Sequence, residues 1–160
     1  MIATRRLVIS ALVGAVYIAL TLLLAPISYG AVQFRVSEAL TVLPYYIPST
    51  AWGLFVGCLI SNIFSPTASI LDIVFGSLAT LLAGYITSKL KSKLLAPLPP
   101  VVINAIVIGA VLSYTTAPGA VMAAFPAIAL SVGVGQFVVC YALGLPLLFA
   151  LSKLKRIWQD

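Results

Sequence analysis

The chain has 160 residues and a net charge of +6; 62% of its residues are hydrophobic and only 8% are charged. A mean hydropathy of +1.20 is far above that of a soluble domain and is typical of a chain built from membrane spans. The positive charge does not indicate nucleic-acid binding, because the basic residues gather in short clusters at the ends of apolar segments, as they do beside membrane spans.

Taken in chain order, the apolar segments predict an all-α membrane protein with one domain, residues 1–160, and six transmembrane helices in one bundle. The first run is too long for the hydrophobic region of a cleaved signal peptide. Pro44 and Pro48 leave the region 36–65 open to two interpretations, one kinked span or two short ones. The expected spans are about 7–27, 36–47, 51–65, 70–90, 99–116 and 126–152.

The basic residues decide between these two interpretations. Eight of the nine Lys and Arg residues fall in three clusters, at 5–6, 89–93 and 153–156. Positive residues in short loops stay cytoplasmic, and six spans place all three clusters on that side, whereas five would turn the 89–93 loop outward. We therefore expect six spans with the N- and C-termini both cytoplasmic.

A few polar side chains interrupt the apolar segments at the outer side of this topology. Arg35 and Glu38 lie at the entry to the second helix, Asn62 near the outer end of the third, and Asp72 in the first turn of the fourth. Gln136 lies two to three turns in from the outer end of the sixth. Ionisable groups at membrane depth usually face a cavity or a partner, so this set predicts a ligand site.

Each of these residues also has a structural interpretation. The two charges of the second helix are three positions apart and could pair only with each other. Ser69 and Asp72 match a capping box that opens the fourth helix. Asn62 and Gln136 could bond across helices, and we interpret Asn104, near the inner end of the fifth helix, as such a structural hydrogen-bonding residue.

Two stripes of small residues recur at four-residue spacing. They are Ala11, Ala15 and Ala19 in the first span, and Gly76, Thr80 and Gly84 in the fourth. Such stripes let another helix approach closely, either inside the bundle or from a partner protein, and spacing alone does not choose between the two.

The composition argues against catalysis. The chain has no His and three acidic residues, and it lacks a glycine-rich lysine loop, which excludes P-loop ATP hydrolysis, HExxH zinc chemistry and a Ser-His-Asp triad. Cys58 and Cys140 lie in apolar runs and predict neither a disulfide nor a metal site. We expect a protein without enzymatic activity, metal or cofactor of its own that recognises a polar solute. The alternatives are an autonomous small-solute carrier or channel, and a ligand-free membrane scaffold.

Two stretches resemble a specific family. "VQFRVSEALTVLP" at residues 32–44 and "ASILDIVFGSLATLLAG" at 68–84 closely resemble the queuosine-precursor transporter family (QueT), whose members look like substrate-binding S components of energy-coupling factor (ECF) transporters. The resemblance implies a six-helix bundle in a prokaryotic plasma membrane that binds a 7-deazaguanine, such as 7-aminomethyl-7-deazaguanine, from outside. It also implies docking through the alanine stripe on a transmembrane coupling subunit, with two ABC ATPases that use ATP.

For such a substrate, eight residues are expected to form the binding site. They are Gln33, Phe34, Arg35, Glu38, Asn62, Asp72, Tyr114 and Gln136. The Glu38 carboxylate could accept two adjacent N–H groups of the base, and Asp72 could pair with the aminomethyl cation. Phe34, Tyr114 or Phe125 could stack on the flat ring.

Overall fold

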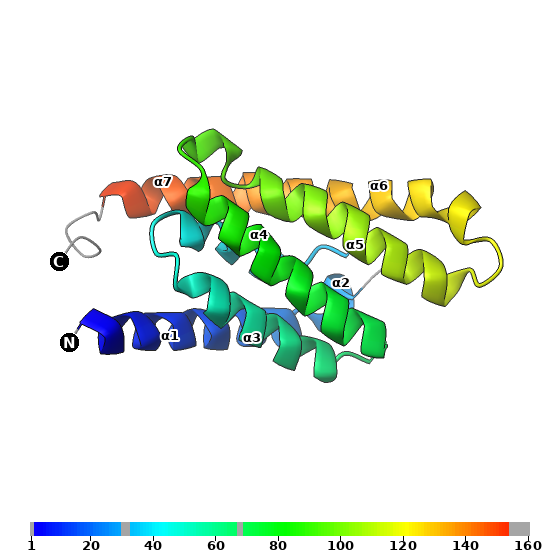
Figure 1. Ribbon diagram of the computed structural model, residues 1–160, viewed down its shortest axis with the longest axis horizontal. Coiled ribbons are helices and arrows are strands. Elements are labelled where there is room, and N and C mark those ends of the chain that lie inside the picture. The colour runs from blue at the N-terminus through cyan, green and yellow to red at the C-terminus, as the bar shows by residue number, and fades with distance from the viewer. Residues whose placement is uncertain (1, 30–32, 67–68, 154–160) are drawn as a thin grey trace.

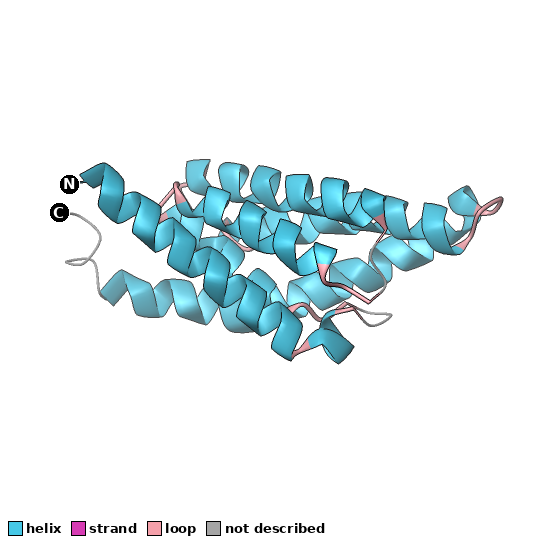
Figure 2. Cartoon of the chain, turned by 90° about the horizontal axis from the view of Figure 1, so that it is seen from below, coloured by secondary structure: helices cyan, strands magenta, loops and turns pink. Residues whose placement is uncertain are grey.

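The computed structural model describes residues 2–29, 33–66 and 69–153, and within these ranges every regular element is helical (Figure 2). The α-helices are α1 (Ile2–Leu23), α2 (Ala25–Ser28), α3 (Thr50–Ile63), α4 (Ser77–Lys89), α5 (Leu98–Thr116), α6 (Val121–Val139) and α7 (Leu145–Lys153). The described elements also include the 3₁₀ segments η1 (Val36–Tyr45) and η3 (Lys93–Leu95), and the π-helical turns η2 (Asp72–Gly76) and η4 (Cys140–Gly144). The expected all-α class is confirmed.

Three stretches of the described chain are long and apolar enough to cross a membrane, Thr4–Leu23, Lys93–Thr116 and Val121–Lys153. The segments between the first two are shorter, since α3 has 14 residues and η1 has ten. A 3₁₀ helix rises about 2.0 Å per residue, so η1 covers roughly 20 Å of a hydrocarbon core about 30 Å thick. The count of six spans therefore stays a prediction.

The three basic clusters of the sequence lead to one end of the bundle. Figure 1 shows the start of α1, the Lys89 end of α4 and the Lys153 end of α7 at the same end of the molecule, on the left of the view. The turn between η1 and α3 also lies at this end. This is the arrangement that the charge distribution predicts for the cytoplasmic side, and the orientation in a membrane remains a prediction.

Close packing of α1 on α3 depends on glycine. A Cβ atom placed on Gly14 would lie 2.7 Å from the carbonyl oxygen of Gly53, and one on Gly57 would lie 2.9 Å from the carbonyl oxygen of Gly14. A Cβ on Gly53 would overlap the carbonyl of Ser10. The backbones of the two helices therefore touch, and Tyr17 of α1 is carried into a buried cluster with residues of α3.

The two small-residue stripes have opposite surroundings. Ala11, Ala15 and Ala19 are exposed on the outer face of α1, away from the α3 contact. The stripe on η2 and α4 faces inward, since Thr80 is buried and a Cβ on Gly84 would lie 3.0 Å from the Cβ of Ala51 on α3. The structure thus leaves the α1 stripe exposed and uses the α4 stripe for internal packing.

Candidate functional site

Polar side chains gather at two adjoining places in the apolar bundle. The first, here called the outer cavity, is lined by Tyr29, Gln33, Arg35, Asn62, Ser65, Asp72, Ile108 and Leu112. The second, the inner cluster, consists of Tyr17, Glu38, Asn104, Gln136 and Cys140. The two places are linked along the chain, because Arg35 and Glu38 lie three residues apart at the start of η1. Together they are called here the polar region.

The outer cavity is small and is dominated by the Arg35 guanidinium. Its volume is about 20 Å³, which is room for one or two water molecules. Arg35 is 8% exposed, lies 5.4 Å over the ring of Tyr29 and donates from Nη1 to the Cys58 Sγ at 3.7 Å. Its buried Nε–H has no hydrogen-bond partner among the described residues. An unpaired charged donor in a dry site is costly, so this N–H is available to an acceptor on a ligand.

The path of the chain into the bundle explains why Arg35 is buried. Gln33 has a positive φ of 50°, a conformation that side-chain-bearing residues rarely adopt, and its carbonyl accepts the backbone N–H of Arg35 at 2.8 Å. This tight turn directs the chain inward before η1 begins at Val36.

On the opposite wall, Asp72 serves as the cap that its sequence context predicts. The backbone N–H of Asp72 donates to the Ser69 hydroxyl at 3.1 Å, and the Ser69 N–H donates to the Asp72 carboxylate at 3.3 Å. This is the reciprocal pattern of a capping box. Asn62 donates to the Asp72 carbonyl at 3.1 Å and thereby ties α3 to η2. Asp72 is half-buried and also lines the outer cavity, so its carboxylate has both a capping role and access to a ligand.

The inner cluster is organised around the Glu38 carboxylate, which is 1% exposed. The Tyr17 hydroxyl donates to Glu38 Oε1 at 2.5 Å, and Asn104 Nδ2 donates to Glu38 Oε2 at 3.4 Å. Asn104 Nδ2 also donates to Gln136 Oε1 at 3.2 Å. The carboxylate thus joins η1 to α1 and α5, and Asn104 extends the link to Gln136 on α6.

The orientation of the Asn104 amide follows from its neighbours. Because Glu38 and Gln136 both present oxygen atoms, the amide nitrogen must face them, and the amide oxygen Oδ1 points elsewhere. Oδ1 is buried and has no partner within the described chain. The region therefore holds one unused donor, on Arg35, and one unused acceptor, on Asn104.

One interpretation of their spacing was that Arg35 and Glu38 pair only with each other. Both also contact other residues in the structure. Arg35 contacts Tyr29 and Cys58, whereas Glu38 contacts Tyr17 and Asn104. The two charges nevertheless lie close together, since each is in the electrostatic field of the other and Tyr17 interacts with both.

The structure brings together six of the eight residues expected to bind ligand. Gln33, Arg35, Asn62 and Asp72 line the outer cavity, and Glu38 and Gln136 belong to the inner cluster. The other two, Phe34 and Tyr114, lie apart from both groups and are 37% and 62% exposed. Their proposed stacking on a ligand stays a prediction.

Among the residues of the polar region that were not expected ligands, Tyr17, Tyr29 and Asn104 contact Arg35 or Glu38 directly. Tyr17 lies on the same face of α1 as Gly14 and Thr21. The sequence shows their helical spacing, but only the structure shows that this face is buried. Tyr29 covers Arg35. Asn104 was interpreted as structural because it lies near the inner end of α5, yet it contacts Glu38 directly.

The chemistry that the described side chains offer here is hydrogen bonding. In the described part of the chain, no group of three His, Cys, Asp or Glu side chains is arranged to hold a metal ion. A buried carboxylate, two side-chain amides and a guanidinium supply both donors and acceptors at short range. Such a set suits recognition of a small polar molecule with N–H and carbonyl groups.

Comparison with known proteins agrees with this picture. No solved structure matches the chain significantly. The queuosine precursor transporter QueT of Lactococcus lactis subsp. cremoris (strain MG1363) is 40% identical over 80 residues, a match that covers 49% of this chain and 46% of that protein. The aligned part is thus about half the length of the curated relative. The family model described as QueT transporter matches residues 7–153, nearly the whole chain, which therefore belongs to the QueT transporter family.

Proposed function

We propose that this chain is the substrate-binding S component of an ECF-type importer, which captures a queuosine precursor of the 7-deazaguanine class from outside the cell. The observation that carries the proposal is the buried Glu38 carboxylate with its donors Tyr17 and Asn104, in a member of the QueT transporter family. The name of the Lactococcus relative supports the substrate class. The role is transport, without a catalytic step.

The hydrogen-bonding groups of the polar region match those of a deazaguanine. The base presents two adjacent N–H donors beside a carbonyl oxygen. Glu38 and the unused Oδ1 of Asn104 are acceptors for the donors, and the unused Nε–H of Arg35 is a donor for the carbonyl. Asp72, on the opposite wall, is the remaining carboxylate and suits the cationic arm of 7-aminomethyl-7-deazaguanine.

Binding requires the outer cavity to open. A bicyclic base needs far more than the roughly 20 Å³ present, since ligand pockets usually measure about 300–1,000 Å³. The turn at Gln33 forms part of the lining and is held by one backbone hydrogen bond to Arg35. We assign the opening movement to this segment.

The partners belong to the same proposal. In this reading a transmembrane coupling subunit docks on the exposed face of α1 that carries Ala11, Ala15 and Ala19, and two ABC ATPases supply energy from ATP. The complex lies in the prokaryotic plasma membrane, with the basic end of the bundle in the cytoplasm.

The first test is a calorimetric titration of the purified chain with 7-aminomethyl-7-deazaguanine, its 7-cyano analogue, queuine, guanine and adenine. We expect the deazaguanines to bind at least tenfold more tightly than adenine, whose edge lacks the adjacent N–H pair. Glu38→Gln should weaken binding by about 10- to 100-fold, the usual effect of losing a charge-assisted hydrogen bond.

A pair of variants separates the two roles of Asp72. Asp72→Asn removes the negative charge, while Ser69→Ala removes the cap partner and keeps the carboxylate. If Asp72 binds the aminomethyl cation, Asp72→Asn weakens that ligand more than the uncharged 7-cyano analogue, and Ser69→Ala weakens both equally. Unchanged affinity in both Glu38→Gln and Asp72→Asn, or equal affinity for adenine, would disprove the proposed site.

Uptake into vesicles tests the partner requirement. We expect accumulation of the base only when the coupling subunit, both ATPases and ATP are present. Uptake by the purified chain alone would favour an autonomous carrier.

A further inference from the structure

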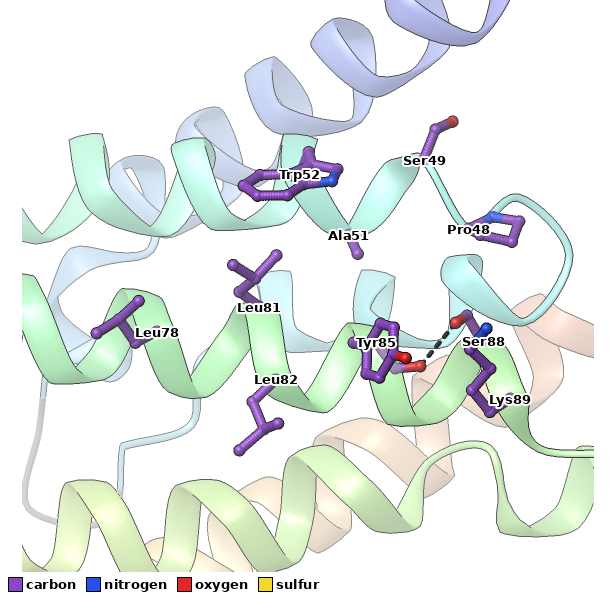
Figure 3. Close-up of a pocket in the computed structure, with 10 residues that line it drawn as sticks. All are labelled: Pro48, Ser49, Ala51, Trp52, Leu78, Leu81, Leu82, Tyr85, Ser88 and Lys89. Atoms are coloured by element: carbon purple, nitrogen blue, oxygen red, sulfur yellow. Dashed lines mark hydrogen bonds between the residues drawn. The ribbon is translucent and has the colours of Figure 1, made fainter.

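A second hollow lies on the outside of the bundle between α3 and α4 and is called here the α3–α4 groove (Figure 3). It is open and has a volume of about 730 Å³. Trp52 of α3 and Leu81 and Tyr85 of α4 form its walls. Its floor is the place where Ala51 and Gly84 let the two helices touch. None of its lining residues belongs to the outer cavity, so it is a separate site.

The groove changes from apolar to basic along its length. Leu78 and Leu82 lie at one end, and Lys89 lies at the other, where α4 ends. The Lys89 ammonium is 5.3 Å from the centre of the Tyr85 ring, so this side chain folds back over the groove (Figure 3). Ser88 beside it adds a hydroxyl, which donates to the Tyr85 carbonyl at 2.6 Å. The groove therefore has a hydrocarbon part and a cationic end.

The groove's exposure indicates a hydrocarbon occupant. Trp52 is 63% exposed and Tyr85 is 58% exposed, and Leu78 and Leu82 are each about half exposed. In a membrane such residues contact acyl chains, with Trp and Tyr near the headgroups. A flat polar base would lose its hydration here without gaining the buried hydrogen bonds that the inner cluster offers.

The cationic end indicates the kind of lipid. Within the described ranges, no acidic residue lines the groove, so no described carboxylate there faces Lys89. Lys91 and Lys93 follow within four residues, at the end of the bundle where the basic clusters meet. A lysine ammonium binds a phosphate as a point charge, and basic residues at this level favour anionic lipids. We propose that the α3–α4 groove binds an anionic phospholipid, with an acyl chain between Trp52 and Leu81 and the phosphate on Lys89.

Trp52 provides a direct probe, because the chain has only one other tryptophan, Trp158. In a Trp158→Phe background, the purified protein is placed in vesicles of phosphatidylcholine with a varied fraction of phosphatidylglycerol. One of the two lipids at a time carries bromine on its acyl chains, and quenching of Trp52 reports which lipid occupies the groove. We expect phosphatidylglycerol to be preferred about fivefold, as about 1 kcal/mol per basic residue predicts.

Two lysine variants provide the matched comparison. Lys89→Gln should reduce the preference to nearly one. Lys93→Gln makes the same charge change at the same end of the protein, but its ammonium lies over Tyr46 and Phe149, outside the groove. It should leave the preference at Trp52 close to fivefold. Excess inorganic phosphate should not compete.

Four outcomes would overturn the proposal. The first is equal quenching by both brominated lipids, and the second is no quenching by either, which would show that lipid does not enter. The third is an equal loss of preference in Lys89→Gln and Lys93→Gln, which would indicate general surface charge instead of a site. The fourth is abolition of the preference by inorganic phosphate, which would indicate a free-anion site. None of these depends on the deazaguanine site.

Discussion

Replacing Gly14 by alanine tests how closely α1 must approach α3. The added Cβ would lie 2.7 Å from the carbonyl oxygen of Gly53, where ordinary contact begins at 3.4 Å. The obstructing atom belongs to the backbone and cannot rotate away. The helices must therefore move apart, and Tyr17, three residues further along α1, must move away from Glu38.

The expected size follows from two opposing effects. Alanine is favoured over glycine inside a helix by about 1 kcal/mol, and overpacking a close contact costs about 1–3 kcal/mol. Because the clash is with backbone, the upper half of that range applies, and the net loss in the free energy of unfolding is about 1–2 kcal/mol. For a chain of this size the thermal midpoint should fall by roughly 2–8 °C, measured by circular dichroism in detergent micelles.

Gly133→Ala is the matched control. A Cβ there would lie 3.3 Å from the Cβ of Ala105, just inside the 3.4 Å at which ordinary contact begins, so a far smaller shift relieves it. The gain in helix propensity should offset that contact, leaving the midpoint within about 2 °C of the parent. A Gly14→Ala protein as stable as the parent, or one that loses no more than Gly133→Ala, would refute the close α1–α3 packing.

Three further predictions concern single side chains. Tyr17→Phe removes the donor to Glu38 Oε1 and should lower the free energy of unfolding by about 1–3 kcal/mol, measured by the same thermal assay. Ser69→Ala removes the cap of the helix that begins at η2 and should cost about 0.5–2 kcal/mol in that assay. Ala15→Leu adds volume to an exposed face and should change unfolding by less than about 0.5 kcal/mol; ligand binding should persist while uptake with the coupling subunit falls.

The sequence predicted only those features of the ligand region that depend on residues close together in the chain. The cap formed by Ser69 and Asp72 depends on a four-residue pattern, and the structure confirms it. The position of Glu38 within an apolar segment was enough to predict that it is buried. Its partners could not be predicted, because they depend on how deeply η1 lies relative to α5, and a 3₁₀ helix with Pro44 near its end cannot be told from a short α-helix by composition.

The small-residue stripes illustrate the same limit for packing. The stripes beginning at Ala11 and at Gly76 have equal spacing, and nothing in their periodicity distinguishes a free face from a buried one. The distinguishing facts are tertiary, namely the contact of Gly84 with Ala51 and the exposure of Ala15. The cytoplasmic placement of the termini stays a prediction from the charges, although the start of α1 and the Lys153 end of α7 lie at the same end of the bundle.

The hydrogen bond from Tyr17 to Glu38 has a mechanical consequence for α1. Helix α1 is a single 22-residue helix, and Tyr17 and Ala15 lie on opposite sides of it. A helix with an unbroken backbone ladder moves as one rod, so a rotation that pulls the phenol away from the carboxylate also turns the outward face by the same angle. The direction in which the Ala15 face of α1 points therefore depends on whether Tyr17 stays bonded to Glu38.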